Sequence, residues 1–205
     1  MSEEVSKRRR TVCNEIARRK NSQRRNDKTG IVKVDNFLNH QLDVELLDEC
    51  GKEFARLFKD KRVTKILTIE ASGIAIAICA ARHMGNIPVV FAKKAQTKNV
   101  DDDVYQTPVM SFTHGREFMV RVAKKYISPD DKLLIIDDFL ANGKAVLGLL
   151  DIAEQAGAEV AGVGICVEKV FQDGGAIVRD MGVEVHSLAM IDLDENGEMK
   201  FVQSR

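Results

Sequence analysis

Tryptophan is absent from this sequence of 205 residues, only 5% of the residues are aromatic, and there are three prolines and four cysteines. The 44% hydrophobic content suffices for one domain of ordinary size, whose core must consist mainly of Ile, Val, Leu and Ala. The cysteines form no CxxC pair, so they are typical of buried or free cytosolic thiols rather than of a zinc site. The longest apolar runs, such as residues 74–81, are far too short to span a bilayer.

Charge is unevenly distributed, although the net charge is zero. Residues 1–28 carry ten Lys or Arg against four Asp or Glu, and they show little apolar periodicity. We therefore expect residues 1–30 to form a basic N-terminal extension outside a domain made of residues 31–205. A solvated extension is the favoured interpretation, and contact with nucleic acid or an anionic surface is the alternative. Because the chain opens with charged residues, no secretory signal is expected.

From residue 31 onward, short apolar runs alternate with segments of helical periodicity. Asp43 suits the N-cap of a first helix, because apolar residues follow it at helical spacing, namely Val44, Leu47, Cys50, Phe54 and Leu57. Further helices are expected at residues 73–84, 144–156 and 176–181, the second of them ending at Gly157. Strands are expected at residues 64–69, 88–92, 109–113, 117–123, 132–136, 160–167, 183–188 and 199–202.

This alternation predicts an α/β fold, in which helices flank a mostly parallel twisted sheet. Ligands of such folds bind beyond the carboxyl ends of the strands, which directs attention to the exits after residues 69, 136 and 167. The polar stretch at residues 93–108 is too long for a routine connection, so it predicts a mobile functional loop.

Two adjacent carboxylates, Asp137 and Asp138, follow the apolar run at residues 132–136, and a short loop containing Gly143 then leads into a helix. The carboxylates can accept hydrogen bonds from vicinal ribose hydroxyls. Successive N–H groups of residues 141–145 can cradle a phosphate at the positive end of the helix. A solvated strand end is the competing interpretation for an Asp-Asp pair alone, but the whole run is more specific and favours a sugar-phosphate site.

The run from Leu133 to Ala145 resembles the signature of the type I phosphoribosyltransferases, which bind phosphoribosyl pyrophosphate (PRPP). That signature has four apolar residues, two acids and a phosphate loop. The loop is most often Thr-Gly-Gly-Thr, whereas this chain has Asn-Gly-Lys-Ala at residues 142–145, a departure that resembles the xanthine-specific branch of the family. Residues 34–41, 68–75 and 167–169 also match in the expected order, so the resemblance covers roughly residues 31–203.

The resemblance implies a type I phosphoribosyltransferase fold with a small base-binding hood and a flexible lid. It makes Asp137 and Asp138 the catalytic pair that binds the ribose hydroxyls. It also places pyrophosphate on residues 71–73 and on at least one of Lys93 and Lys94. Without the resemblance, residues 71–73 would be interpreted as a tight turn and helix cap, and the two lysines as a solvated face. The implied PRPP contacts are Ala71, Ser72, Gly73, Lys93, Lys94, Ala141, Asn142, Gly143, Lys144 and Ala145.

The same resemblance implies how a purine would be held. Asn39 lies on the C2 side of the base, Lys169 donates to the oxygen at C6, and the backbone of Val32 adds a contact. Without the resemblance, Asn39 would be a turn residue and Lys169 a surface lysine. Phe139 either stacks on the purine or belongs to the core. A homodimer, and Mg²⁺ bound mainly through PRPP oxygens and water, are further expectations from the family.

No protein nucleophile is expected, since the four histidines show no ligand spacing and no Ser-His-Asp or Cys-His arrangement stands out. This pattern agrees with a transfer in which a purine nitrogen attacks C1 of ribose as pyrophosphate leaves. The hypothesis is a cytoplasmic purine-salvage enzyme that converts xanthine and PRPP to xanthosine 5′-monophosphate and pyrophosphate. Two alternatives stay open: a transferase for hypoxanthine or guanine, and a PRPP-sensing purine regulator of the same fold without catalysis.

Overall fold

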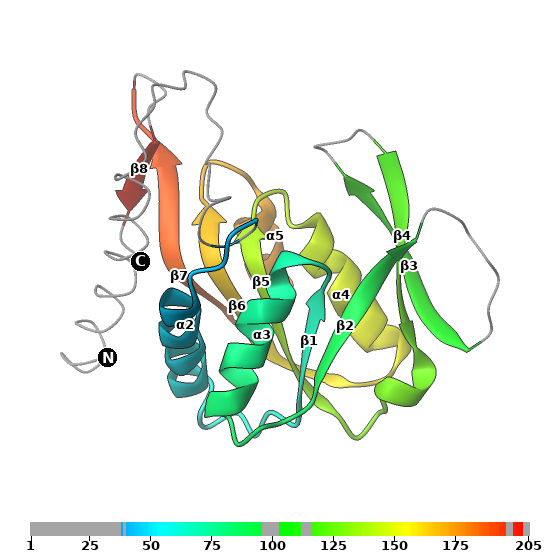
Figure 1. The fold of residues 1–205 in the computed structure, drawn as a ribbon. Helices are drawn as coiled ribbons and strands as arrows, with labels where there is room; N and C mark the ends of the chain where they lie inside the picture. Colours follow the sequence, from blue (N-terminus) through cyan, green and yellow to red (C-terminus); the bar gives the residue numbers. More distant parts are fainter. Residues whose placement is uncertain (1–37, 39, 96–102, 112–115, 196–198, 203–205) are drawn as a thin grey trace.

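A computed structural model describes residues 38, 40–95, 103–111, 116–195 and 199–202 of the chain. These residues form one eight-stranded sheet with the strand order β3-β4-β2-β1-β5-β6-β7-β8, drawn in Figure 1. In chain order the strands are β1 (Lys65–Ile69), β2 (Val89–Ala95), β3 (Val104–Ser111), β4 (Arg116–Ala123), β5 (Lys132–Leu140), β6 (Glu159–Lys169), β7 (Val185–Leu193) and β8 (Met199–Val202).

The centre of the sheet, from β2 through β1, β5 and β6 to β7, is parallel, and antiparallel pairs lie at its two edges. The helices are α2 (Val44–Leu57), α3 (Ser72–His83), α4 (Lys144–Gln155) and α5 (Gly174–Asp180), with a 3-10 turn η1 (Lys124–Tyr126). Figure 1 shows α2 and α3 side by side. Among the described residues, no helix has the length and apolar composition needed to cross a bilayer.

Strand β5 shows why this sequence forms a sheet covered on both faces. Leu134 and Ile136 are fully buried in a cluster with α2 and α3, whereas Leu133 and Ile135 are fully buried in a second cluster with α4. Because successive side chains of a strand point to opposite faces, a continuous apolar run is what a strand with two covered faces requires. The predicted mostly parallel sheet flanked by helices is therefore confirmed.

Local signals placed two helix ends correctly. The Asp43 side chain accepts a hydrogen bond from the Leu46 N–H at 3.0 Å and caps α2, as predicted. Helix α4 stops just before Gly157, which has a left-handed φ of +67°. Among the cysteines of the described part of the chain, Cys50 and Cys166 are buried, and neither is in a disulfide.

Several strand boundaries differ from the predictions, among them those of β5, β2 and β3. Strand β5 continues through the acid pair to Leu140, because its pairing with β6 runs on to the Leu140–Glu168 register. Strand β2 continues to Ala95 because it pairs with β4. Strand β3 begins at Val104, so the polar connection expected over residues 93–108 is shorter than predicted, and its residues 96–102 lie outside the described part.

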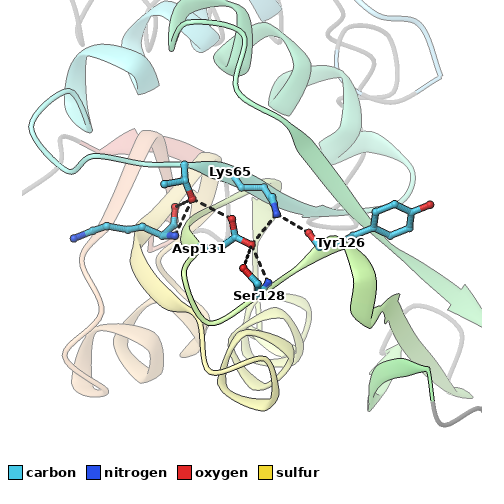
Figure 2. Close-up of polar contacts among 6 residues, drawn as sticks. Lys65, Tyr126, Ser128 and Asp131 are labelled. Atoms are coloured by element: carbon cyan, nitrogen blue, oxygen red, sulfur yellow. Dashed lines mark hydrogen bonds and ion pairs between the residues drawn. The ribbon is translucent and has the colours of Figure 1, made fainter.

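The amino ends of the central strands are joined by a polar network (Figure 2). The Lys65 ammonium at the start of β1 donates to Asp131 Oδ2 and to the Tyr126 carbonyl oxygen, both at 2.7 Å. The N–H of Ser128 donates to the same carboxylate oxygen of Asp131 at 2.8 Å. These bonds fix the segment before β5 against β1 at the edge of the sheet opposite its carboxyl ends.

Candidate functional site

The acid pair lies near the carboxyl end of β5, inside the strand rather than after it. The Asp137 side chain is only 4% exposed, whereas that of Asp138 is partly buried. Asp137 Oδ1 accepts the Asp138 N–H at 2.9 Å, and Asp138 Oδ1 accepts the Phe139 N–H at 3.0 Å. Each carboxylate is therefore oriented by the backbone N–H of the next residue.

Burial raises the pKa of Asp137 well above its usual range, and the neighbouring charge of Asp138 adds to this effect. The positive charge of Lys94 acts in the opposite direction. At a given pH, Asp137 is therefore neutral more often than an exposed aspartate. A perturbed carboxyl group at the carboxyl edge of a parallel sheet is typical of a functional site.

The predicted phosphate loop follows β5 and leads directly into α4. Gly143 has a φ of +77°, a left-handed conformation that glycine adopts without the steric penalty of a Cβ atom. No side chain of the described residues caps the first turn of α4. Its N–H groups therefore lie at the positive end of the helix dipole without a side-chain acceptor, which suits an anion.

The second predicted loop connects β1 to α3 and lies against the acid pair. A Cβ atom on Gly73 would overlap the Thr68 hydroxyl and would lie 3.1 Å from Asp137 Oδ1. Only glycine therefore allows α3 to begin so close to Asp137. The Glu70 carboxylate accepts the Lys94 N–H at 2.6 Å, which ties this loop to β2.

A pocket of about 230 Å³ brings the phosphate loop together with other predicted residues. Its lining includes Lys94 on β2 and Phe139 on β5, both of which were predicted as ligand contacts. The complete lining is Lys94, Val109, Met110, Phe118, Phe139, Leu140, Ala141, Asn142, Gly143, Lys144, Ala145 and Val146. The structure thus gathers one predicted lysine, one predicted aromatic residue and all five residues of the phosphate loop.

The two adjacent lysines of β2 are in different positions. The Lys94 ammonium lies 5.4 Å from the centroid of the Phe118 ring at the pocket. Both lysines are exposed, and in the register between β2 and β4 Lys93 is opposite Arg121. Since neighbouring side chains of a strand point to opposite faces, Lys93 points away from the pocket that Lys94 lines.

Of the four predicted purine contacts, the structure describes Lys169 and Phe139 and brings them together. The Lys169 ammonium, at the end of β6, lies 5.6 Å from the centroid of the Phe139 ring. Burial lowers the pKa of Lys169 below that of an exposed lysine. Val32 and Asn39 lie outside the described residues.

Sequence reasoning missed several residues that contact the site, among them Met110, Phe118 and Gly174. Met110 and Phe118, on β3 and β4, line the same pocket as the phosphate loop. Gly174, at the start of α5, donates its N–H to the carbonyl oxygen of Ala141 at 3.1 Å. The Gly-Gly pair at residues 174–175 was the only local signal of that close approach, since its partner is remote in sequence.

Comparison with known proteins decides the family. No protein-family model matches the chain. The xanthine phosphoribosyltransferase of Ruminiclostridium cellulolyticum is 56% identical over 173 residues, which cover 84% of this chain and 90% of that protein. The xanthine phosphoribosyltransferase of Bifidobacterium longum strain NCC 2705 is 58% identical over 173 residues, with 83% and 90% covered. This chain belongs to the xanthine phosphoribosyltransferase family.

Solved structures agree with this membership at the level of the fold. An adenine phosphoribosyltransferase of Giardia lamblia in complex with 9-deazaadenine superposes with a TM-score of 0.63 at 24% identity, covering 74% of this chain and 81% of that one. The adenine phosphoribosyltransferase of Thermoanaerobacter pseudethanolicus gives 0.62 at 19% identity, covering 72% and 82%. The xanthine phosphoribosyltransferase family thus shares its phosphoribosyltransferase fold with proteins named for adenine.

Proposed function

We propose that this chain transfers the 5-phosphoribosyl group of PRPP to xanthine, forming xanthosine 5′-monophosphate and pyrophosphate in purine salvage. The membership of the xanthine phosphoribosyltransferase family supports the activity. The arrangement that supports it most directly is the acid pair, Asp137 and Asp138, which lies between the two predicted anion loops, with Lys169 and Phe139 nearby.

In this reaction the bond between C1 of ribose and a pyrophosphate oxygen breaks, and a purine nitrogen forms the new bond to C1 and loses its proton to water. Asp137 and Asp138 accept hydrogen bonds from the ribose hydroxyls. The N–H groups of residues 141–145 bind the 5′-phosphate, and residues 71–73 with Lys94 bind pyrophosphate. The protein therefore contributes positioning and electrostatic stabilisation of the departing charge.

Base selection in this proposal depends on polar groups at the purine. Xanthine carries oxygens at C2 and C6, and the Lys169 ammonium donates to the C6 oxygen while Asn39 and the backbone of Val32 serve the C2 side. Phe139 stacks on the ring. A base without the matching acceptor leaves a partly buried ammonium unpaired, which disfavours its binding.

Mg²⁺ fits this site as an ion held through PRPP oxygens and water. In the described part of the chain, no three His, Cys, Asp or Glu side chains come together as a metal cage, and the acid pair is already bonded to backbone N–H groups. Magnesium commonly binds substrate phosphates with few protein ligands. Bound in this way, it would neutralise charge on the departing pyrophosphate.

The proposal includes three properties of the whole protein: a homodimer, a cytoplasmic location, and a basic extension at residues 1–30 that is separate from the transferase domain at residues 31–205. These follow from the family resemblance and from the uneven charge of the sequence. Sedimentation of the purified chain tests the first, and activity of a chain that starts near residue 31 tests the last.

A spectrophotometric assay with PRPP, Mg²⁺ and each of xanthine, guanine, hypoxanthine and adenine tests the central proposal. We expect nucleotide to form fastest with xanthine. A faster reaction with hypoxanthine or guanine would keep the transferase and refute the assignment of the base pocket. Measurable PRPP binding without turnover of any purine would refute the enzyme and favour a PRPP-sensing regulator.

A further inference from the structure

Helix α5 begins directly against the phosphate loop, and the contact is backbone on backbone. The Gly174 N–H donates to the Ala141 carbonyl oxygen at 3.1 Å. A Cβ atom on Gly174 would overlap both that oxygen and the Gly143 nitrogen, and would lie 2.6 Å from the carbonyl carbon of Asn142. All three contacts are backbone atoms, so no side-chain rotation can relieve the overlap.

The contact is just as close when seen from the loop. A Cβ atom on Gly143 would lie 3.0 Å from the Gly174 Cα atom, and Gly143 already requires its left-handed φ. Two glycines, remote in sequence, therefore face each other where β5 passes into α4. The position of one backbone fixes the position of the other, because close-packed protein interiors transmit such shifts.

An ion pair between a buried carboxylate and a partly exposed guanidinium holds α5 in this place from its other side. Glu168 on β6 is 2% exposed, and Arg179 of α5 donates to its two carboxylate oxygens at 2.7 Å each. The Ser187 hydroxyl also donates to Glu168. Burial opposes ionisation of Glu168, but the hydrogen bonds from Arg179 and Ser187 outweigh it, so the pKa of Glu168 is lowered. The pair is charged at neutral pH and binds α5 to β6.

Gly175 completes the arrangement. A Cβ atom there would overlap Glu168 Oε1 and lie 2.6 Å from Arg179 Nη1. Gly174 thus lacks a side chain because it faces the phosphate loop, and Gly175 because it faces the Glu168–Arg179 ion pair. This makes α5 a short support set between the loop and β6.

We propose that Gly174 is a positioning residue for the phosphate loop: α5, held by the Glu168–Arg179 pair, supports the loop and fixes the direction of its N–H groups toward the 5′-phosphate. The inference rests on the proposed function insofar as residues 141–145 bind that phosphate. A misplacement of about 1 Å in such groups can cost about 100-fold in rate. Gly174 itself does not touch the substrate.

The variant Gly174→Ala tests this role through a comparison of two ligands. We expect calorimetry to show ribose 5-phosphate binding about tenfold more weakly than to the wild type, with the affinity for Mg²⁺-pyrophosphate unchanged. Pyrophosphate is proposed to bind residues 71–73 and Lys94, which α5 does not support. A general loss of stability would not separate the two ligands in this way. Equal affinity of the variant and the wild type for ribose 5-phosphate would overturn the inference.

Gly51→Ala is the matched control. A Cβ atom on Gly51 would also press on backbone, 2.6 Å from the Cys79 carbonyl carbon, but at the contact between α2 and α3. It therefore brings a comparable packing defect without touching the phosphate loop. We expect the affinity of Gly51→Ala for ribose 5-phosphate to equal that of the wild type.

If Gly174→Ala yields no folded protein, Arg179→Lys carries the test, because it removes the bidentate pair with Glu168 and adds no atom near the loop. We expect about a threefold loss of ribose 5-phosphate affinity and unchanged pyrophosphate affinity; an equal change for both ligands would overturn the inference.

The proposed function is tested separately from the role of Gly174. If the wild type converts xanthine but the variants show no selective loss of ribose 5-phosphate affinity, the proposed activity stands and the role of Gly174 is refuted. If the selective loss occurs but no purine is converted, the role of Gly174 stands and the proposed activity is refuted.

Discussion

The ammonium of Lys169 lies 5.6 Å from the centre of the Phe139 ring, although the two residues belong to different strands. Strands β5 and β6 are paired so that Phe139 is opposite Val167, which brings the end of β6 beside the ring. An aromatic side chain can stack on the face of a flat ring, and a neighbouring cation can bind an oxygen at the edge of that ring. This geometry makes Lys169 the sharpest test of base recognition.

Replacing Lys169 by Met should lower kcat/KM for xanthine by about 10- to 100-fold, since a hydrogen bond from a charged donor is worth about 1.5–3 kcal/mol. The KM for PRPP should stay near the wild-type value. Steady-state kinetics with each substrate varied in turn would show this. Lys125→Met is the control, because Lys125 is exposed and lies by Tyr126, away from the pocket. Equal losses for both substrates would contradict the assignment.

The pH dependence of xanthine binding should also reveal Lys169. Burial lowers the pKa of its ammonium, so the charge is lost at a lower pH than for an exposed lysine, and the KM for xanthine should rise as the pH increases. In Lys169→Arg the guanidinium stays charged over this range. The ratio of the two KM values therefore isolates Lys169 from the ionisation of xanthine itself. A ratio that stays constant across the alkaline range would rule out this explanation.

The two adjacent lysines of β2 offer a matched pair. We expect Lys94→Met to weaken Mg²⁺-pyrophosphate binding by about tenfold, because a charge-assisted contact is lost from the pocket. Lys93→Met should have little effect, since Lys93 is on the opposite face of the strand. Calorimetry on both variants measures the difference. The reverse order of effects would show that the strand presents its other face to PRPP.

Asp137→Asn should stabilise the protein as the pH rises. The pKa of Asp137 is higher in the folded chain than in the unfolded chain. Between these two pKa values the unfolded chain binds fewer protons, so the free energy of unfolding of the wild type falls as the pH rises. The amide oxygen can still accept the Asp138 N–H. The Tm of the variant should match the wild type near about pH 4 and exceed it increasingly toward neutral pH. Scanning calorimetry over this range measures the two Tm values. A difference between them that does not grow with pH would contradict the prediction.

Asp131→Asn should have the opposite pH dependence. Burial disfavours the Asp131 charge, but hydrogen bonds from Lys65 and the Ser128 N–H outweigh it and lower the pKa. The stabilising effect is present above the unfolded pKa and is lost as the pH falls through the folded one. We expect the variant to lose about 2 kcal/mol of unfolding free energy at neutral pH and the difference to vanish in acid. The value of kcat/KM should not change.

Local chemistry predicted much of this molecule. Helix α2 begins at its Asp43 cap because that capping bond needs only neighbouring residues, and the apolar residues of β5 alternate between the two core clusters. The boundary after residue 136 was wrong because the ladder with β6 continues past the polar pair. Backbone pairing with a remote strand prevailed there over side-chain polarity.

Apart from the Gly-Gly pair at residues 174–175, the remote contacts of the site had no such local signal. Lys94 was predicted to begin a mobile loop, but pairing with Val120 of β4 places it in a strand. The closeness of Gly174 to the phosphate loop depends on how α5 packs after β6 has formed. Motif resemblance could name residues 141–145 and Lys169, whereas only the folded chain shows which neighbours orient them.

The central place of β1 in the sheet affects how this chain folds during synthesis. Its partner β2 follows soon after it, but its other partner, β5, comes only after β3, β4 and η1. The edge of β1 that pairs with β5 therefore stays unpaired until β5 has left the ribosome, and such edges are where growing chains pair wrongly. Translation intermediates that end before β5 are thus the species that we expect molecular chaperones to hold, and competence to bind ligand arises only in the last third of translation.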